Sequence, residues 1–178
     1  MKKMMKTLTA LMLLLALAVA AMVPAGAESA FTFRNGITFG MTMDQVIASE
    51  PGHCEIDRER THGPVDFMEA EYEFVTENGA RADLTYLFVD EKLAAIRVDH
   101  DARRVNYDSL KAELTALYGE ATALDLNALG NGIFAVDDDG RPEWGAEAFV
   151  NGDVMIVLER DGDDIDVTYL DMSAGYIL

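Results

Sequence analysis

The sequence is poor in cysteine and in basic residues, and each shortage excludes a class of structure or of partner. Cys54 is the only cysteine of the 178 residues, so the chain cannot form an internal disulfide. Lysine and arginine number 14 against 32 aspartate and glutamate residues, which gives a net charge of −18 at pH 7. Because binding to the phosphates of a nucleic acid needs clustered Lys and Arg, this composition argues against a nucleic-acid partner. We expect the Cys54 side chain to be partly buried and to have no chemical role. The alternatives are a reactive free thiol and an intermolecular disulfide.

The first 27 residues have the three parts of a cleavable secretory signal peptide. Three lysines lie among the first six residues, an apolar stretch covers 8–23, and small residues stand at Ala25 and Ala27. Cleavage after Ala27 would remove three lysines and no acidic residue, which changes the net charge from −18 to −21. The alternative is a membrane anchor, because the apolar stretch is only slightly shorter than the roughly 20 residues of a spanning helix. No cysteine follows for lipid attachment, so we predict a secreted or extracytoplasmic product without stable membrane insertion.

Residues 28–104 are predicted to form a first unit of one helix and three strands. Thr42 and Gln45 have the spacing of a capping box at a helix start, and Pro51 ends that helix. Apolar and polar residues then alternate in three stretches, at 68–74, 82–88 and 94–99. The short connections between these stretches predict an antiparallel meander.

Residues 105–178 are predicted to repeat this plan as a second unit. A helix is expected from about Asn106 to Tyr118, with Gly119 as its stop signal. Three further strands are expected at 144–150, 153–160 and 164–171. The sequence therefore predicts an α+β fold of two tandem helix-plus-three-stranded antiparallel units. Together they would form one compact domain, with a curved sheet and both helices packed on one face.

Two short motifs resemble those of a known family. The stretch 40–46 (GMTMDQV) opens the first predicted helix, and the stretch 117–121 (LYGEA) closes the second. They are similar to the signatures of the family that groups outer-membrane assembly lipoproteins of the SmpA/OmlA type with secreted β-lactamase inhibitory proteins. The resemblance implies tandem helix-plus-sheet units and, from the inhibitory members, binding of an enzyme by the concave sheet face. The lipidated cysteine of the lipoproteins and the disulfides of the inhibitors have no counterpart here, and no binding residue is carried over.

The sequence contains no motif that indicates a cofactor or a catalytic centre. The three histidines have no paired ligand spacing for zinc, and a nucleophile elbow, a glycine-rich phosphate loop and a His-Glu-x-x-His stretch are all lacking. The acidic stretches 137–139 and 161–166 do not follow the ligand order of an EF-hand, so turn-forming aspartates are the ordinary explanation. We therefore expect neither a metal nor another cofactor, and no enzymatic activity.

The strand phases place acidic residues together on the uncovered face of the predicted sheet. We predict this face to be the binding site, with apolar residues at 87, 155, 157 and 170 interspersed among the acids. Its candidate residues are Glu69, Glu71, Glu73, Arg97, Asp164 and Asp166. Because charge steers a basic partner and exposed apolar groups supply affinity, the pattern indicates a non-enzymatic module that binds a protein. Two alternatives remain, namely a small hydrolase or ligand-binding domain with a pocket between helix and sheet, and a calcium-stabilised envelope protein.

Overall fold

The computed structural model describes residues 31–57, 61–62, 65–124 and 146–174. All of these residues belong to one compact unit, Phe31–Leu178. The predicted signal peptide and the acidic stretch 137–139 lie outside the described residues. None of the helices in the described ranges has the length and apolar character needed to cross a membrane.

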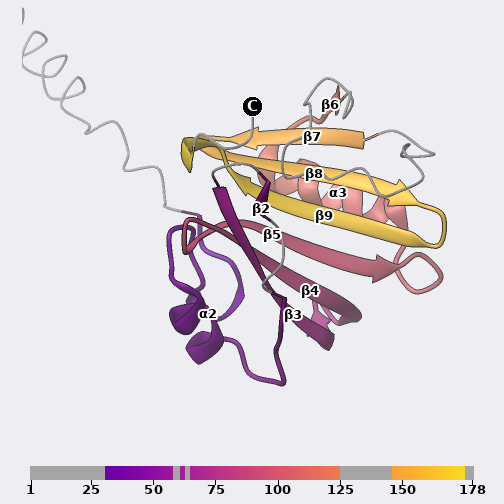
Figure 1. Cartoon of the computed structure of the whole chain (residues 1–178). Coiled ribbons are helices and arrows are strands. Elements are labelled where there is room, and N and C mark those ends of the chain that lie inside the picture. The colour runs from indigo at the N-terminus through magenta and orange to yellow at the C-terminus, as the bar shows by residue number, and fades with distance from the viewer. Residues whose placement is uncertain (1–30, 58–60, 63–64, 125–145, 175–178) are drawn as a thin grey trace, which may run out of the picture. The chain divides into compact units, whose positions relative to one another are not determined.

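One antiparallel sheet dominates the unit (Figure 1). Its strands are β1 (Glu55–Asp57), β2 (Thr61–His62), β3 (Val65–Glu77), β4 (Ala80–Val89), β5 (Lys92–Asp101), β6 (Thr122–Leu124), β7 (Ala146–Asn151), β8 (Val154–Asp161) and β9 (Asp164–Asp171). The strand order is β1-β3-β4-β5-β9-β8-β7-β6. Strand β2 is not part of this order and pairs with β3 alone. The long strands form because β-branched, aromatic and aliphatic residues alternate with polar ones along them.

Two α-helices accompany the sheet in the described part of the chain, α2 (Met43–Ser49) and α3 (Tyr107–Tyr118). The predicted capping box is confirmed, because the Thr42 hydroxyl accepts from the Gln45 amide while the Gln45 side chain accepts from the Thr42 amide. Asn106 caps α3 in the same way by accepting from the Ser109 amide at 3.0 Å. Short 3₁₀ turns, η1 (Arg34–Gly36) and η3 (Met172–Ala174), complete the elements.

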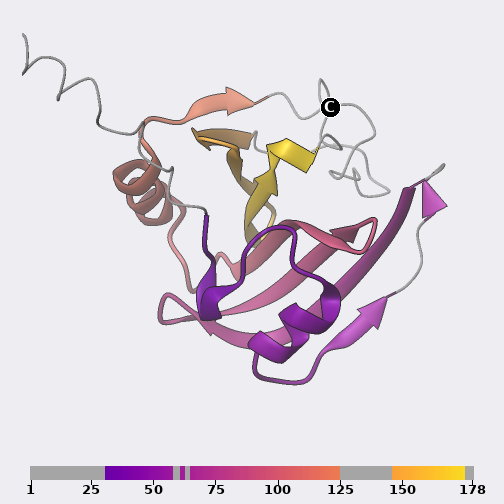
Figure 2. The same cartoon turned by 90° about the vertical axis from the view of Figure 1, so that its left-hand side faces the viewer.

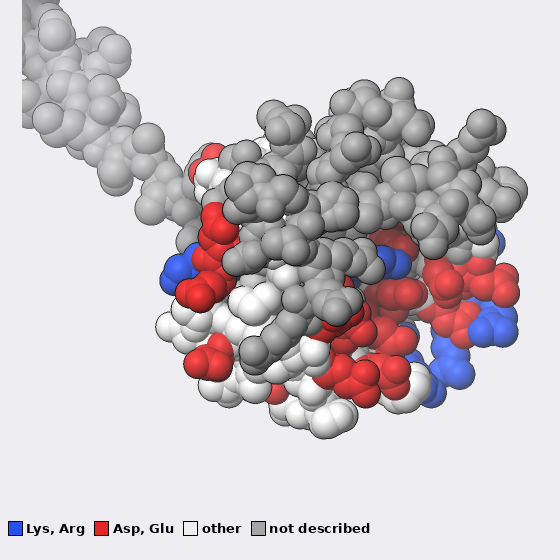
Figure 3. All heavy atoms as spheres, in the orientation of Figure 1, with Lys and Arg blue, Asp and Glu red and all other residues white. Residues whose placement is uncertain are grey.

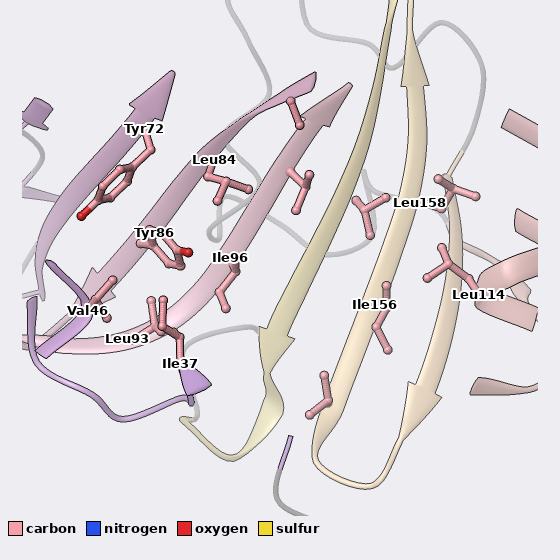
Figure 4. Close-up of a cluster of buried hydrophobic side chains, with 14 of the residues drawn as sticks. Ile37, Val46, Tyr72, Leu84, Tyr86, Leu93, Ile96, Leu114, Ile156 and Leu158 are labelled. Carbon is pink, nitrogen blue, oxygen red and sulfur yellow. The ribbon is translucent and has the colours of Figure 1, made fainter. Parts of the chain in front are cut away.

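A single large hydrophobic cluster lies on one face of the sheet (Figure 4). Val46 of α2 and Leu114 of α3 belong to it, together with inward side chains of β3, β4, β5, β8 and β9. Figure 2 shows the segment from η1 to α2 lying over β3, β4 and β5. Backbone hydrogen bonds attach this segment to the sheet, because the Gly40 amide donates to the Leu93 carbonyl and the Leu93 amide donates to the Met41 carbonyl.

The prediction of two tandem helix-plus-three-strand units is wrong, although the antiparallel sheet with helices agrees with the α+β class. The chain is mostly sheet, with five strands before α3 and at least four after it among the described residues. Strands β5 and β9 pair directly, so residues from both predicted units share one continuous open sheet. The sequence did not reveal β1, β2 and β6 because strands of two or three residues are too short to show an alternating pattern.

Candidate functional site

Carboxylates line up across four neighbouring strands on the sheet face that is turned away from α3. The register pairs Asp83 with Asp99, Asp99 with Asp166, and Asp166 with Glu159. These four residues, which we call the acidic row, run at right angles to β4, β5, β9 and β8. Helix α3 lies behind β8 and β9 in Figure 1, so the same view in Figure 3 looks onto this face and shows acidic side chains gathered there.

A second line of paired residues runs beside the acidic row. Glu71 pairs with Thr85, Thr85 with Arg97, and Arg97 with Thr168. Glu55 of β1 pairs with Glu71 on the outer side, which extends the negative charge to the edge of the sheet. An arginine therefore lies in the middle of a surface that is otherwise rich in carboxylates.

The structure brings five of the six predicted site residues onto this face. Glu69 and Glu71 lie on β3, Arg97 on β5, and Asp164 and Asp166 on β9, all in the same phase of the sheet register. The sixth residue, Glu73, is exposed and lies within an irregularity of β3 between Tyr72 and Val75. Asp83 and Glu159 were not predicted, although they occupy the outward phase of β4 and β8 and the alternation of those strands could have revealed them.

Arg97 and Asp166 form a two-pronged ion pair at the centre of the face. The Arg97 Nε donates to Asp166 Oδ1 at 2.9 Å, and Nη2 donates to Oδ2 at 3.3 Å. The Asp166 side chain is only 6% exposed, whereas that of Arg97 is 55% exposed. Burial alone would lower the pKa of Arg97, but the charge and hydrogen bonds of Asp166 outweigh it, so the pKa is raised.

Two carboxylates beside this pair, those of Asp99 and Glu71, have raised pKa values. Burial, followed by the charges of Asp166 and Asp164, raises the pKa of Asp99 to about 6. Burial also raises the pKa of Glu71, with a further contribution from the negative charges of Glu69 and Asp57. The single guanidinium of Arg97 lowers both pKa values and does not cancel the repulsion. The face therefore holds more negative charge than its own cations neutralise.

The apolar residues expected among these acids are not exposed, and that prediction is wrong. Val157 and Leu170 are 0% exposed and Met155 is 8% exposed, because they belong to a second hydrophobic cluster on this face, formed mainly by β7, β8 and β9. Ala95, Ala146 and Ala148 complete its buried part, and Leu87, Leu124 and Met172 pack against it. The alternating pattern predicted the correct face for these side chains, but it does not indicate whether that part of the face is exposed or buried.

Two other polar groupings are less suited to binding. Glu50 is buried, accepts hydrogen bonds from the Tyr86 hydroxyl at 2.9 Å and the Asn35 amide at 3.1 Å, and lies 3.3 Å from Arg34 Nη2. This network joins η1 and the end of α2 to β4. Burial and the adjoining Glu50 charge raise the pKa of Tyr86. The Glu50 charge is balanced by Arg34 within the network, which indicates a structural role.

A cavity of about 550 Å³ opens where α3 begins, near the ends of β8 and β9. Its polar lining includes Tyr107, Glu147 and Arg160. The Glu147 carboxylate accepts from the Tyr107 hydroxyl at 3.0 Å and from Lys111 Nζ at 2.6 Å, so its charge is already neutralised. The cavity therefore has less uncompensated charge than the acidic face, and it is less suited to attract a charged partner.

The described residues contain no group of three or more His, Cys, Asp or Glu side chains placed to hold a metal ion. His100 is buried in the sheet while His53 is exposed, and Cys54 is free and half-buried, as expected. No protein-family model matches the chain, and no curated protein or solved structure gives a significant match.

Proposed function

We propose that this protein is a non-enzymatic binding module whose acidic sheet face recognises a protein partner with a Lys- and Arg-rich surface. The observation that carries the proposal is the acidic row, in which Asp83, Asp99, Asp166 and Glu159 stand side by side on four adjacent strands. Export by a signal peptide, and kinship with the lipoprotein and inhibitor family, remain predictions from the sequence and are not needed for this proposal.

The electrostatics of the face favour a cationic partner. Like charges on neighbouring strands repel one another, and after burial this repulsion is the next cause of the raised pKa values of Asp99 and Glu71. A partner that places ammonium or guanidinium groups among these carboxylates relieves the repulsion and forms charge-assisted hydrogen bonds. The net charge of −18 also speeds encounters with a positively charged molecule, more strongly at low salt.

A charge-reduced variant tests the proposal with a peptide of alternating lysine and serine as the probe. We expect the purified protein to bind this peptide in isothermal titration calorimetry and to bind it at least about tenfold more weakly at physiological than at low salt. The double substitution Asp83→Asn, Asp99→Asn should weaken binding several-fold, because it removes two charges from the acidic row.

The matched control is Glu113→Gln, Glu120→Gln, which removes two exposed charges from α3 and the residues after it. This variant has the same net charge as the first but an intact acidic row, so we expect it to bind the peptide like the wild type. Equal losses in both variants would mean that only the total charge matters. That result, or no binding at all, would refute the proposed site.

A further inference from the structure

Strand β3 contains an irregularity that places Phe74 in an unusual conformation. The register shifts between Tyr72 and Val75, so Glu73 and Phe74 together stand opposite the single residue Asp83 of β4. Phe74 has a φ of 61°, in the left-handed region that bulky side chains rarely adopt. Such a conformation costs free energy and persists only when surrounding contacts impose it.

The contacts of Phe74 direct its ring to the acidic face. Its amide donates to Asp83 Oδ1 at 2.6 Å, and the guanidinium carbon of Arg81 lies 3.6 Å from the ring centroid. Arg81 and Asp83 flank Ala82, whose side chain is buried in the core, so they point to the opposite face of the sheet. The ring therefore lies beside the first carboxylate of the acidic row.

The ring contributes little to the folded core, because Phe74 is 59% exposed. Glycine or asparagine would adopt the positive φ at lower cost. A large apolar side chain that is both exposed and held in an unfavourable conformation indicates a role outside folding. Bulges elsewhere in proteins re-aim side chains in this way beside binding sites.

We propose that Phe74 is the apolar anchor of the acidic face. Resting on the binding function proposed above, this inference specifies the partner, whose basic surface carries an exposed aliphatic or aromatic side chain that packs on the Phe74 ring. Aromatic residues are enriched at protein interfaces, where buried anchors supply affinity while surrounding charges supply orientation. The stacking of Arg81 holds the ring in place before binding, which lowers the entropy lost on association.

A second copy of this chain does not fit as the occupant. It would bring the same acidic row and a net charge of −18 against this face, and like charges across an interface oppose association. A cationic partner meets the carboxylates with opposite charge instead. Charge complementarity therefore favours a basic protein segment that carries an apolar side chain.

Two peptides of equal charge test the anchor, one of alternating lysine and serine and the other of alternating lysine and leucine. We expect the wild-type protein to bind the leucine peptide about tenfold more tightly, because only this peptide can pack on the ring. Phe74→Gly should abolish this preference and leave the affinity for the serine peptide unchanged. Glycine adopts a positive φ without strain, so the melting temperature of the Phe74→Gly variant should equal or exceed that of the wild type.

Leu117→Ser is the control, because Leu117 is 70% exposed on α3, away from the acidic face. This variant should keep the preference for the leucine peptide. If the preference survives Phe74→Gly, or if the wild type shows none, the anchor is refuted while the acidic face still stands. If the serine peptide fails to bind or is insensitive to Asp83→Asn, Asp99→Asn, the proposed function itself is refuted.

Discussion

Two halves of the same sheet face differ sharply in character. On β3, β4 and β5 several outward positions carry charge, among them Glu71, Asp83 and Arg97, and all three are exposed. On β7, β8 and β9 the same face is mostly apolar apart from acids such as Asp166, and residues such as Val157 and Leu170 are buried there. Alternation along a strand thus assigns a side chain to a face, whereas burial depends on what lies next to that face.

Asp166 lies at the boundary between the two halves. It is 4% exposed, like the apolar residues of the buried half, yet it belongs to the acidic row. Its buried charge is tolerated because Arg97 reaches it from the open half of the face. The two halves are therefore coupled through one ion pair, and substitutions on either side of it should have distinct effects.

The largest effect is expected on the apolar half. Leu170→Ala should lower the free energy of unfolding by about 3 kcal/mol, because it leaves a cavity in the second hydrophobic cluster. Val150→Ala, on β7 and 58% exposed, is the control and should change stability by less than about 0.5 kcal/mol. Urea denaturation measures both, and a small loss for Leu170→Ala would show that this half of the face is not truly packed.

A smaller effect is expected at the boundary. Arg97→Gln should destabilise the protein by about 1–2 kcal/mol at pH 7, since it leaves Asp166 buried beside Asp99 without a counter-charge. The control is Arg103→Gln, which breaks an exposed contact to Asp101 and should leave the melting temperature unchanged. Equal stability of Arg97→Gln and the wild type would argue that solvent already screens the pair.

The smallest and opposite effect is expected on the acidic half. The pKa of Asp99 is raised to about 6 from its ordinary value of 3.8, so the folded state binds a proton between these pH values that the unfolded state does not. This group therefore favours folding below about pH 4, and its contribution is lost as the pH rises through 6. Asp99→Asn should stabilise the protein at pH 7 by about 1 kcal/mol.

Melting temperatures of the wild type and of Asp99→Asn, measured between pH 4 and 7.5, test whether the ionised Asp99 side chain destabilises the folded protein. The stability advantage of the variant should shrink as the pH falls below about 6, where the wild-type carboxyl becomes protonated. Glu113→Gln serves as a control because Glu113 is exposed on α3. A constant advantage at every pH would contradict a raised pKa as its cause.

Much of the local structure was predictable from particular residues. The Thr42 and Gln45 pair marks the start of α2, and the alternation in β4 and β5 assigns Arg97 to the acidic face. The bulge at Phe74 was not predictable, because its cause is a mismatch in pairing between β3 and β4 and not a residue type that favours positive φ. Nor could the ion pair of Arg97 and Asp166 be read from residues that lie 69 positions apart.

By itself, the sequence determined the charge, the absence of an internal disulfide, the helix caps and the side chains of each long strand that share one face of the sheet. These properties depend on composition or on neighbours within a few residues. Only the tertiary structure decided that β5 pairs with β9, that the acids of four strands meet in one row, and that half of their face is buried. Such features depend on contacts between distant segments, and these contacts form when the whole chain packs.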